Sequence, residues 1–281
     1  MRRTVDLSIS IVSWNTRDIL DQCLASVYDT ADGLKLEVIV VDNASTDGSA
    51  DMVRQRYAQA IVIENSENRG FAAANNQALE IARGRYFLLL NPDTVCRPGA
   101  LETLVGFMDS KPKCGAAGPM VLNPDGSLQY SWARFPSFWN EIRGKLDRRI
   151  AGVSRVPKTP DEVRALGAFR VDWVGGCCLM ARRDAIAQVG PMDESLFMYC
   201  EETDWCMRFS RAGWEVWVEP AAEIIHFGGQ SSAQIPEEAA RRLRASKKRY
   251  FEKHCGRCRG FALWSALSMR SVVKRMLKGD Q

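Results

Sequence analysis

The first 120 residues alternate between short runs of β-branched and apolar residues and longer segments with apolar residues at helical spacing. The runs at 7–13, 36–42, 60–64 and 86–91 predict buried strands. Helices are predicted from Asn15 or Thr16, at 45–57, at 70–82 and from about Pro98. This alternation is typical of an α/β protein with a parallel sheet covered on both faces.

Polar residues follow three of the predicted strands. They are Ser13-Trp14-Asn15, Asp42-Asn43 and Asn91-Pro92-Asp93. The carboxyl ends of parallel strands meet at one rim of a sheet, and ligands bind beyond that rim. We therefore expect these clusters to line a common site.

The pattern changes from about residue 121. A turn is predicted at 123–126 and a loop at 143–168. The run 169–183 predicts a strand that enters a short helix, and the next helix is expected to end at Gly213. Two further strands are predicted at 215–220 and 223–229, and the C-terminal part is expected to be helical.

The composition is that of a globular protein, but its charge is unevenly placed. Of 281 residues, 46% are hydrophobic and 26% are charged, with a net charge of +4. Residues 241–278 hold thirteen Lys or Arg and a single acid, Glu252. This excess indicates an anionic partner, either membrane lipid or nucleic acid.

The segment 261–278 favours lipid as that partner. Its apolar and basic residues fall on roughly opposite helical faces, which is typical of an interfacial helix on anionic lipid. The two sets are Met269, Val272, Val273 and Met276, and Arg270, Lys274 and Lys278. Nucleic acid is disfavoured because aromatic residues are few and the apolar face would have no role. Packing on the rest of the chain, or on a second subunit in a homodimer, is the alternative.

The nine cysteines are odd in number and scattered through apolar stretches, without a secretory signal at the N-terminus. Reduced thiols in a cytoplasmic protein are therefore expected. The pair Cys255 and Cys258 lacks a second Cys/His pair at zinc-site spacing, so ordinary thiols are favoured there. No apolar run approaches the roughly 20 residues that span a bilayer. We expect a cytoplasmic protein, with peripheral attachment to the inner face of the plasma membrane through its tail.

Asn91 and Asp93 are the first candidates for chemistry. Pro92 is expected to keep the segment extended, so that both side chains can face one way. A carboxylate and an amide oxygen at a pocket rim suit Mg²⁺ or Mn²⁺ held against a diphosphate. A neutral His226 beside Asp93 would add a third protein ligand. The alternative is a simple turn at the end of a strand.

The acidic run Glu201-Glu202-Thr203-Asp204 opens a predicted helix, where acids favour the helix dipole. Its apolar neighbours at 197–199 would raise a carboxylate pKa and prepare a general base, whereas the helix N-terminus would lower that pKa. Arg69-Gly70, at another helix start, is a candidate anion site. The dinucleotide and P-loop glycine motifs are absent.

Five motifs, in order, resemble family 2 glycosyltransferases of the GT-A fold, and most closely their rhamnosyltransferase-like branch. They are SISIVSWN, EVIVVDNASTDGS, NRGFAAANNQAL, FLLLNPDTV and MYCEETDWCMRFSRAGW. The resemblance covers roughly residues 5–232. It implies a mainly parallel, Rossmann-like sheet in a catalytic domain at 1–235, with a nucleotide-binding half at about 1–121 and an acceptor-side half at about 122–235. A basic, amphipathic helical segment at 236–281 would follow.

The resemblance implies an inverting transfer of a sugar from a nucleotide diphosphate to an acceptor hydroxyl. Glu202 stands where the family places its catalytic base, usually Asp, and Asp42 would contact the pyrimidine base. Asp93, Asn91 and His226 would hold Mn²⁺ or Mg²⁺, with Asn91 in place of the family's usual Asp. The remaining candidates for the nucleotide-sugar site are Ser13, Asn15, Asn43, Arg69 and Asn76. Those for the acceptor side are Trp173, Gly175, Gly176, Glu201 and Asp204.

The branch favours dTDP-rhamnose as donor, with UDP-sugars next. The acceptor would be a glycan or a polyprenyl-diphosphate-linked sugar in cell-surface polysaccharide synthesis. A protein that keeps this fold but only binds nucleotide sugars, or serves as a scaffold, is the alternative function.

Overall fold

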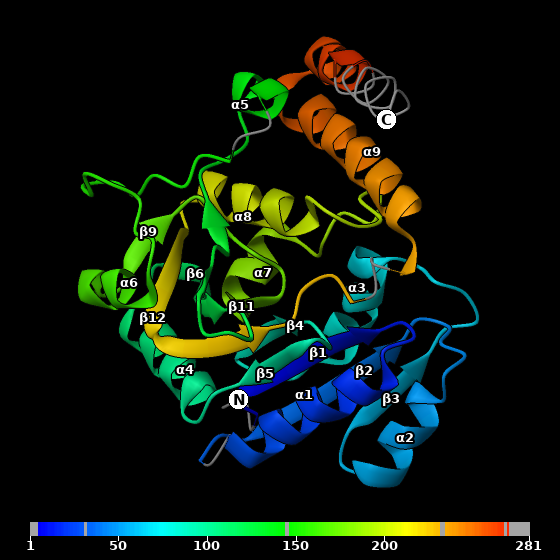
Figure 1. The fold of residues 1–281 in the computed structure, drawn as a ribbon. Helices are drawn as coiled ribbons and strands as arrows, with labels where there is room; N and C mark the ends of the chain where they lie inside the picture. The colour runs from blue at the N-terminus through cyan, green and yellow to red at the C-terminus, as the bar shows by residue number, and fades with distance from the viewer. Residues whose placement is uncertain (1–4, 31–32, 144–145, 231–233, 267–268, 270–281) are drawn as a thin grey trace.

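The computed structural model describes residues 5–30, 33–143, 146–230, 234–266 and 269. The predicted amphipathic face at 269–278 lies outside the described residues except for Met269. The predicted alternation of the N-terminal half is present (Figure 1). Its elements are β1 (Leu7–Ser13), α1 (Arg17–Thr30), β2 (Leu36–Asp42), α2 (Ser49–Arg56), β3 (Ile61–Glu64), α3 (Phe71–Ile81), β4 (Tyr86–Leu90), β5 (Thr94–Cys96) and α4 (Ala100–Ser110).

The second half completes the sheet and adds further helices. Its elements are β6 (Cys114–Leu122), β7 (Leu128–Gln129), β8 (Trp132–Ala133), α5 (Phe138–Arg143), α6 (Pro160–Leu166), β9 (Phe169–Val171), β10 (Trp173–Val174), β11 (Cys178–Arg182), α7 (Arg183–Val189), α8 (Glu201–Arg211), β12 (Glu215–His226) and α9 (Pro236–Cys255). Residues 257–266 are also helical.

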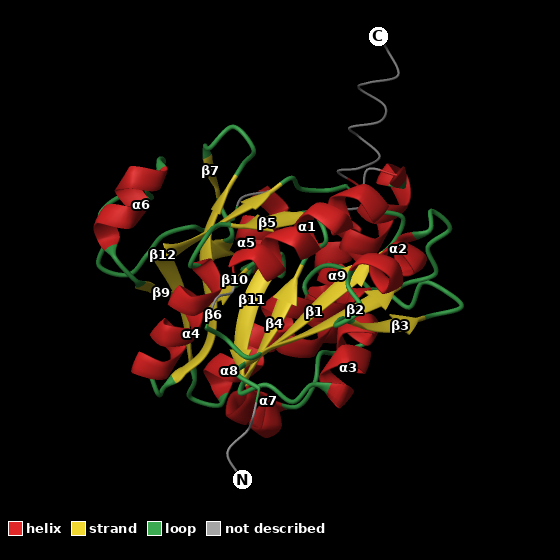
Figure 2. Ribbon diagram, turned by 90° about the horizontal axis from the view of Figure 1, so that it is seen from below, coloured by secondary structure: helices red, strands yellow, loops and turns green. Residues whose placement is uncertain are grey.

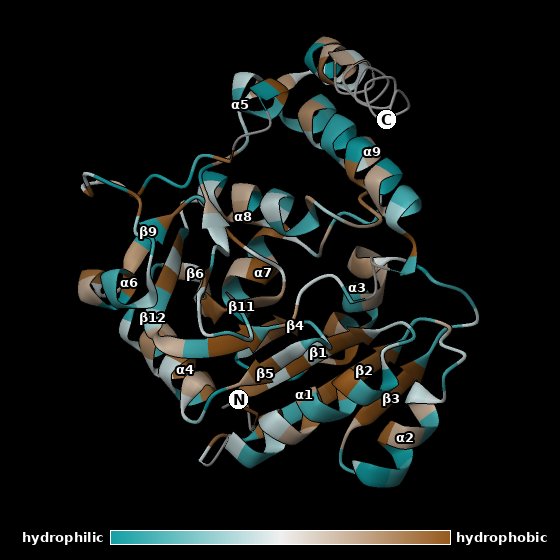
Figure 3. Cartoon of the chain, in the orientation of Figure 1, coloured by the Kyte–Doolittle hydropathy of each residue, from teal (hydrophilic) through white to brown (hydrophobic). Residues whose placement is uncertain are grey.

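The main sheet is mixed and mainly parallel in its first half. Its strand order is β3-β2-β1-β4-β11-β6-β12-β5. β1 pairs in parallel with β2 and β4, whereas β11 is antiparallel to both β4 and β6. Helix α1 covers one face, and α3, α7 and α8 cover the other (Figure 2). Both faces are therefore buried, which explains the continuous apolar runs of the central strands (Figure 3).

The register places the candidate residues together. Ser13 pairs with Asp42 at the carboxyl ends of β1 and β2. His226, at the end of β12, pairs with Thr94 of β5. This antiparallel pair brings the end of β12 against the turn that contains Asp93. Three strands that are distant in sequence thus end at one rim.

Several predictions about local structure were wrong. The segments 215–220 and 223–229 were expected to be two strands, but Glu215–His226 is one strand whose register with β6 shifts between Glu219 and Glu223. Residues 169–183 form three short strands before α7 rather than one. The helix expected from Ser45 begins at Ser49. Pro92 and Asp93 form a turn between β4 and β5, not an extended segment.

The predicted loop at 143–168 contains the short helix α6. Thr159 caps this helix by accepting a hydrogen bond from the backbone N–H of Glu162, and Pro160 occupies its first turn. This capping signal is present in the sequence. The helix is only seven residues long, however, and offers little hydrophobic periodicity.

Helix α9 packs against α8 through a buried carboxylate. Asp204 of α8 lies 2.8 Å from Nζ of Lys253 and 2.7 Å from Nε2 of His254. Ser246 of α9 also donates a hydrogen bond to the carbonyl of Met198, over 2.8 Å. The described part of the segment 236–281 is therefore helical and joined to the sheet domain by polar contacts.

Candidate active site

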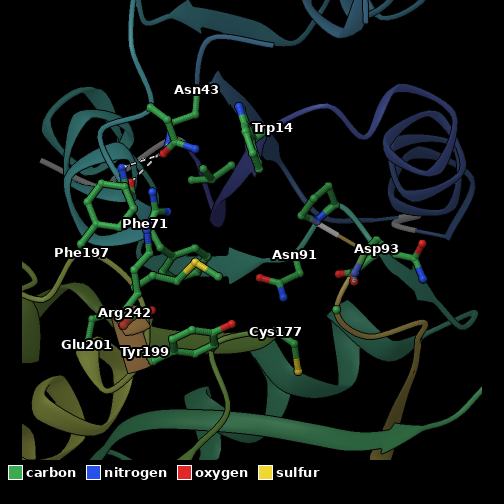
Figure 4. A pocket seen from close by; sticks show the side chains of 18 of the residues that line it. Trp14, Asn43, Phe71, Asn91, Asp93, Cys177, Phe197, Tyr199, Glu201 and Arg242 are labelled. Atoms are coloured by element: carbon green, nitrogen blue, oxygen red, sulfur yellow. Dashed lines mark hydrogen bonds between the residues drawn. The ribbon is translucent and has the colours of Figure 1, made fainter. Parts of the chain in front are cut away.

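A pocket of about 300 Å³ lies beyond the carboxyl ends of β1, β2 and β4; we call it the central pocket. Asn43 and Trp14 lie on one side of it, Asn91 and Asp93 on another, and Tyr199 and Glu201 at a third (Figure 4). The predicted site residues that line it are Asn43, Asn91, Asp93, Gly176, Glu201, Glu202 and His226. The structure thus brings the candidate cation ligands and the candidate base together.

His226 lies against both Asn91 and Asp93 on one side of the pocket. Its Nε2 lies 3.2 Å from Oδ1 of Asp93 and 3.5 Å from Nδ2 of Asn91. Its Nδ1 lies 2.6 Å from Oε1 of Gln129, whose amide nitrogen in turn donates to the carbonyl of His226 over 3.1 Å. The amide oxygen of Gln129 can only accept, so the ring hydrogen is on Nδ1 and a neutral His226 presents a lone pair on Nε2.

The donor set at this wall fits a divalent cation. One carboxylate oxygen and one imidazole nitrogen face each other, and the imidazole is oriented from behind by Gln129. Within the described part of the chain, no group of three or more His, Cys, Asp and Glu side chains could hold a metal. A cation at Asp93 and His226 would therefore need oxygen ligands from its substrate or from water.

Asn43 lines the opposite side of the pocket, whereas its neighbour Asp42 is buried behind it and does not line it. Oδ1 of Asn43 accepts from the backbone N–H of Arg69, and its Nδ2 donates to Oδ1 of Asn68. Asp42 accepts from the backbone N–H of Ser45 through Oδ2, whereas its buried Oδ1 has no hydrogen-bond partner. A buried acceptor without a partner is costly to the folded state.

Gly70 allows the two sides of the site to approach each other. Its φ is +82°, and a Cβ there would lie 2.4 Å from the carbonyl oxygen of Phe197. Only glycine satisfies both conditions. As a result, the N–H of Phe71 donates to that carbonyl over 2.8 Å and joins the start of α3 to the loop before α8.

Strained backbone surrounds the pocket. Among the described residues, positive φ angles at non-glycine residues occur at Asn15, Ala44, Tyr199 and Cys200. The first two follow β1 and β2, and the last two precede α8. Such conformations cost of order 1–3 kcal/mol each and cluster at functional sites.

Glu201 and Glu202 are adjacent carboxylates at the start of α8. Burial raises the pKa of Glu202. Burial, followed by the charge of Glu202, raises the pKa of Glu201 well above its ordinary value. Oε2 of Glu201 is buried without a hydrogen-bond partner. Burial thus favours the protonated form of both acids, and the charge of Glu202 adds to this effect at Glu201.

The other predicted site residues make structural contacts. Asn76 is buried and exchanges hydrogen bonds with the backbone of Met192, and the Ser13 hydroxyl bonds that of Thr16. Asn15 accepts from the N–H of Thr46, and Gly175 donates to the carbonyl of Ser131. Asp204 binds α9, as described above.

Arg69 and Trp173 complete that set. Arg69 is exposed. The indole N–H of Trp173 donates to the carbonyl of Arg134 over 3.1 Å, and its ring lines a second pocket next to α9.

The sequence did not single out Arg242, which reaches the central pocket from α9. Its guanidinium carbon lies 4.1 Å from the ring centroid of Phe197, and its Nη2 lies 2.6 Å from Oε1 of Glu238. Among the described residues it is the one Lys or Arg that lines this pocket. Gln129 was missed as well, because a two-residue strand gives no periodic signal.

Comparisons with known proteins agree with this geometry. The family model described as glycosyl transferase family 2 matches residues 8–178. An N-acetylglucosaminyl-diphospho-decaprenol L-rhamnosyltransferase of Mycobacterium tuberculosis is 30% identical, over 94% of this chain and 91% of that protein. The rhamnosyltransferase WbbL of Escherichia coli is 27% identical, over 87% of this chain and 92% of that protein.

Solved structures confirm the predicted GT-A fold. A Pyrobaculum calidifontis mannosyltransferase, in complex with GDP-Man and Mn²⁺, has a TM-score of 0.57 at 17% identity, over 99% of this chain and 82% of that one. GalNAc-T7 with UDP, GalNAc and Mn²⁺ has a TM-score of 0.62 at 16% identity, over 80% of this chain and 44% of that one. The chain is a glycosyltransferase that belongs to glycosyl transferase family 2, in its rhamnosyltransferase-like branch.

Proposed function

We propose that this glycosyltransferase moves a sugar, with inversion, from a nucleotide diphosphate to an acceptor hydroxyl and depends on a divalent cation. One observation carries the proposal: the pair Asp93 and His226, whose Oδ1 and Nε2 lie 3.2 Å apart, lines the same pocket as Glu202. A group that can hold a diphosphate cation and a group that can remove a proton thus face one cavity.

Different side chains would bind the nucleoside and the cation. The loop held by Asn43 would bind the nucleoside. Asp93 and His226, with Asn91 beside them, would hold Mn²⁺ or Mg²⁺, which when bound offsets the negative charge of the leaving diphosphate. The two glycosyltransferases of similar fold described above were solved with Mn²⁺.

Glu202 would act as the base. It accepts the proton of the acceptor hydroxyl, whose oxygen forms a bond to the anomeric carbon of the donor. The bond from that carbon to the diphosphate breaks, and its electron pair leaves with the nucleotide. A single displacement needs one base on the side opposite the leaving group, so one ionised carboxylate is sufficient.

The relatives support rhamnose as the sugar and a lipid-linked acceptor. The mycobacterial relative is an N-acetylglucosaminyl-diphospho-decaprenol L-rhamnosyltransferase. We therefore infer dTDP-rhamnose as donor, UDP-sugars as second choice, and a polyprenyl-diphosphate-linked sugar as acceptor.

The end of the chain supports contact with an anionic membrane surface. The exposed apolar residues Phe261, Trp264 and Met269 belong to the basic C-terminal segment. No helix in the described ranges is long and apolar enough to cross a bilayer. Contact would therefore be made by the surface of this segment.

A turnover screen tests the proposal. Purified protein is incubated with a set of nucleotide sugars and an N-acetylglucosaminyl-diphospho-prenol acceptor, with Mn²⁺ or with a chelator. We expect a glycosylated product from one donor, at a rate that the chelator abolishes. Donor binding without product from any donor would favour a nucleotide-sugar-binding or scaffold protein instead.

A further inference from the structure

The loop at 190–200 connects α7 to α8 and leads directly into Glu201 and Glu202; we call it the α8 entry loop. Its residues Phe197, Met198 and Tyr199 line the central pocket. Contacts with two helices, α9 and α3, hold this loop. The position of Glu202 in the pocket therefore depends on elements that lie far from it in the sequence.

Helix α9 contacts the α8 entry loop along one of its faces. Side chains spaced four, three and four residues apart reach the loop, and this spacing places them on the same side of a helix. The guanidinium of the first lies over a ring, the hydroxyl of the second donates to a carbonyl over 2.8 Å, and the third and fourth contact a hydroxyl at 3.1 Å and a carboxylate at 2.7 Å. These side chains are Arg242, Ser246, Arg249 and Lys253, and their partners are Phe197, Met198, Ser195 and Asp193.

Helix α3 holds the same loop at other points. Asn76 accepts from the backbone N–H of Met192 over 3.0 Å and donates to its carbonyl over 2.9 Å. The carbonyl of Phe197 accepts from the N–H of Phe71. The carbonyls of Phe197 and Met198 are thus bound to two different helices, which restricts the backbone that follows them.

That backbone is strained. Tyr199 and Cys200 have φ angles of 71° and 69°, in a region that non-glycine residues rarely adopt. Such conformations persist only where the surrounding structure determines them. Helix α9 anchors the chain on both sides of the strained pair: Ser246 binds the carbonyl of Met198 before it, and Asp204 is bound to α9 after it.

We propose that Ser246 is a positioning residue for the transfer reaction. Glu202 lies between the two anchors, four residues after Met198 and two residues before Asp204. The side chain of Ser246 is buried, so water does not readily replace its hydrogen bond. By binding the carbonyl of Met198, Ser246 maintains the turn that directs Glu202 into the central pocket. This inference rests on the proposed function, since it takes Glu202 as the base.

The test removes a single hydroxyl. Ser246→Ala deletes the hydrogen bond to Met198 and alters no side chain that lines the central pocket. Ser110→Ala is the control, because Ser110 donates to the carbonyl of Phe107 over the same 2.8 Å, at the end of α4. We expect Ser246→Ala to lower kcat about tenfold or more at unchanged donor affinity, since a misplaced catalytic group can cost about 10²-fold. Ser110→Ala should keep the wild-type kcat.

A double variant shows whether Ser246 acts through Glu202. In Glu202→Gln, the further change Ser246→Ala should have little effect on the residual turnover, because the group that Ser246 positions is already inactive. A merely structural role would instead lower turnover by the same factor in both backgrounds, together with a loss of Tm. That result, or a wild-type kcat in Ser246→Ala, would overturn the inference.

Hydrogen exchange separates this inference from the proposed function, because it needs no turnover. Amide exchange in the segment 197–204, measured by mass spectrometry, should be faster in Ser246→Ala than in wild type and unchanged in Ser110→Ala. If wild type transfers sugar and Glu202→Gln does not, but exchange in this segment is unchanged in Ser246→Ala, the positioning role fails and the function stands. If no donor supports transfer, the function fails and the positioning role fails with it, while faster exchange would still assign Ser246 to the turn.

Discussion

The Nδ1 hydrogen of His226 is donated to Oε1 of Gln129 over 2.6 Å, and the Gln129 amide returns a hydrogen bond to the carbonyl of His226. This reciprocal pair fixes the tautomer and the direction of the ring, so that Nε2 faces Oδ1 of Asp93 at 3.2 Å. The orientation of His226 toward Asp93 thus depends on Gln129, which does not line the pocket.

Gln129→Leu should weaken metal binding without touching either ligand. Loss of a partner that orients a histidine ligand typically costs about 10–100-fold in metal affinity. We expect a loss of that size in the affinity for dTDP with Mn²⁺, measured by calorimetry, and none with a chelator present. Asp93→Ala should abolish the Mn²⁺-dependent part entirely. The control is Gln188→Leu, because Gln188 accepts from the indole of Trp214 outside the pocket; equal effects of both glutamine variants would contradict the role of Gln129.

Glu201→Gln should stabilise the protein, and more so at higher pH. Burial and the neighbouring charge of Glu202 raise the pKa of Glu201 in the folded state. Above the unfolded pKa, near 4.3, the unfolded chain releases this proton while the folded chain retains it, so stability falls as pH rises. We expect a small change in Tm at pH 5 and a rise of about 2 °C or more at pH 8. A larger gain at pH 5 than at pH 8 would be inconsistent with a raised pKa.

Asp204→Asn should weaken the packing of α9 against α8 and lower the stability of the protein. Burial opposes the charge of Asp204, but hydrogen bonds from His254 and Lys253 outweigh that effect and lower its pKa to about 2. Because the folded pKa lies below the unfolded value of about 3.9, the charge contributes about 2–3 kcal/mol above pH 4 to 5, and this is lost as pH falls toward 2. We expect Asn to lower Tm at pH 7 by at least about 4 °C and to flatten the acid limb of the stability curve. Asp161→Asn, on an exposed side chain, is the control; a similar loss there would remove the special role of Asp204.

The strands and the rim could be predicted because they depend on local pattern. The apolar run at 86–90 and the polar residues after it are sufficient to place Asn91 and Asp93 at a strand end. The meeting of Asp93 with His226 depends instead on the antiparallel pair of β5 and β12, more than 130 positions apart in the chain. Metal-ligand chemistry and the motif resemblance, and not periodicity, connected these two residues.

The contribution of α9 could not be predicted from its pattern. Its basic residues are typical of a solvated face, and the helix is largely hydrophilic (Figure 3). Arg242 nevertheless lines the central pocket, and Leu243 lines the second pocket next to α9. Their roles follow from the docking of α9 on Asp204, which is a tertiary contact between two charged segments without a periodic signature.

The central claim is that Glu202 removes the acceptor proton in a pocket that binds the donor independently of it. The most direct measurement compares Glu202→Gln with wild type, using the donor selected by the turnover screen, for both the rate of transfer and the affinity for donor in Mn²⁺. The neighbouring variant Glu201→Gln is the matched control, since Glu201 is the adjacent buried carboxylate at the start of the same helix. We predict that Glu202→Gln loses about 10²–10⁴-fold in turnover at unchanged donor affinity, while Glu201→Gln keeps most of its activity. Near-normal turnover of Glu202→Gln would contradict the account.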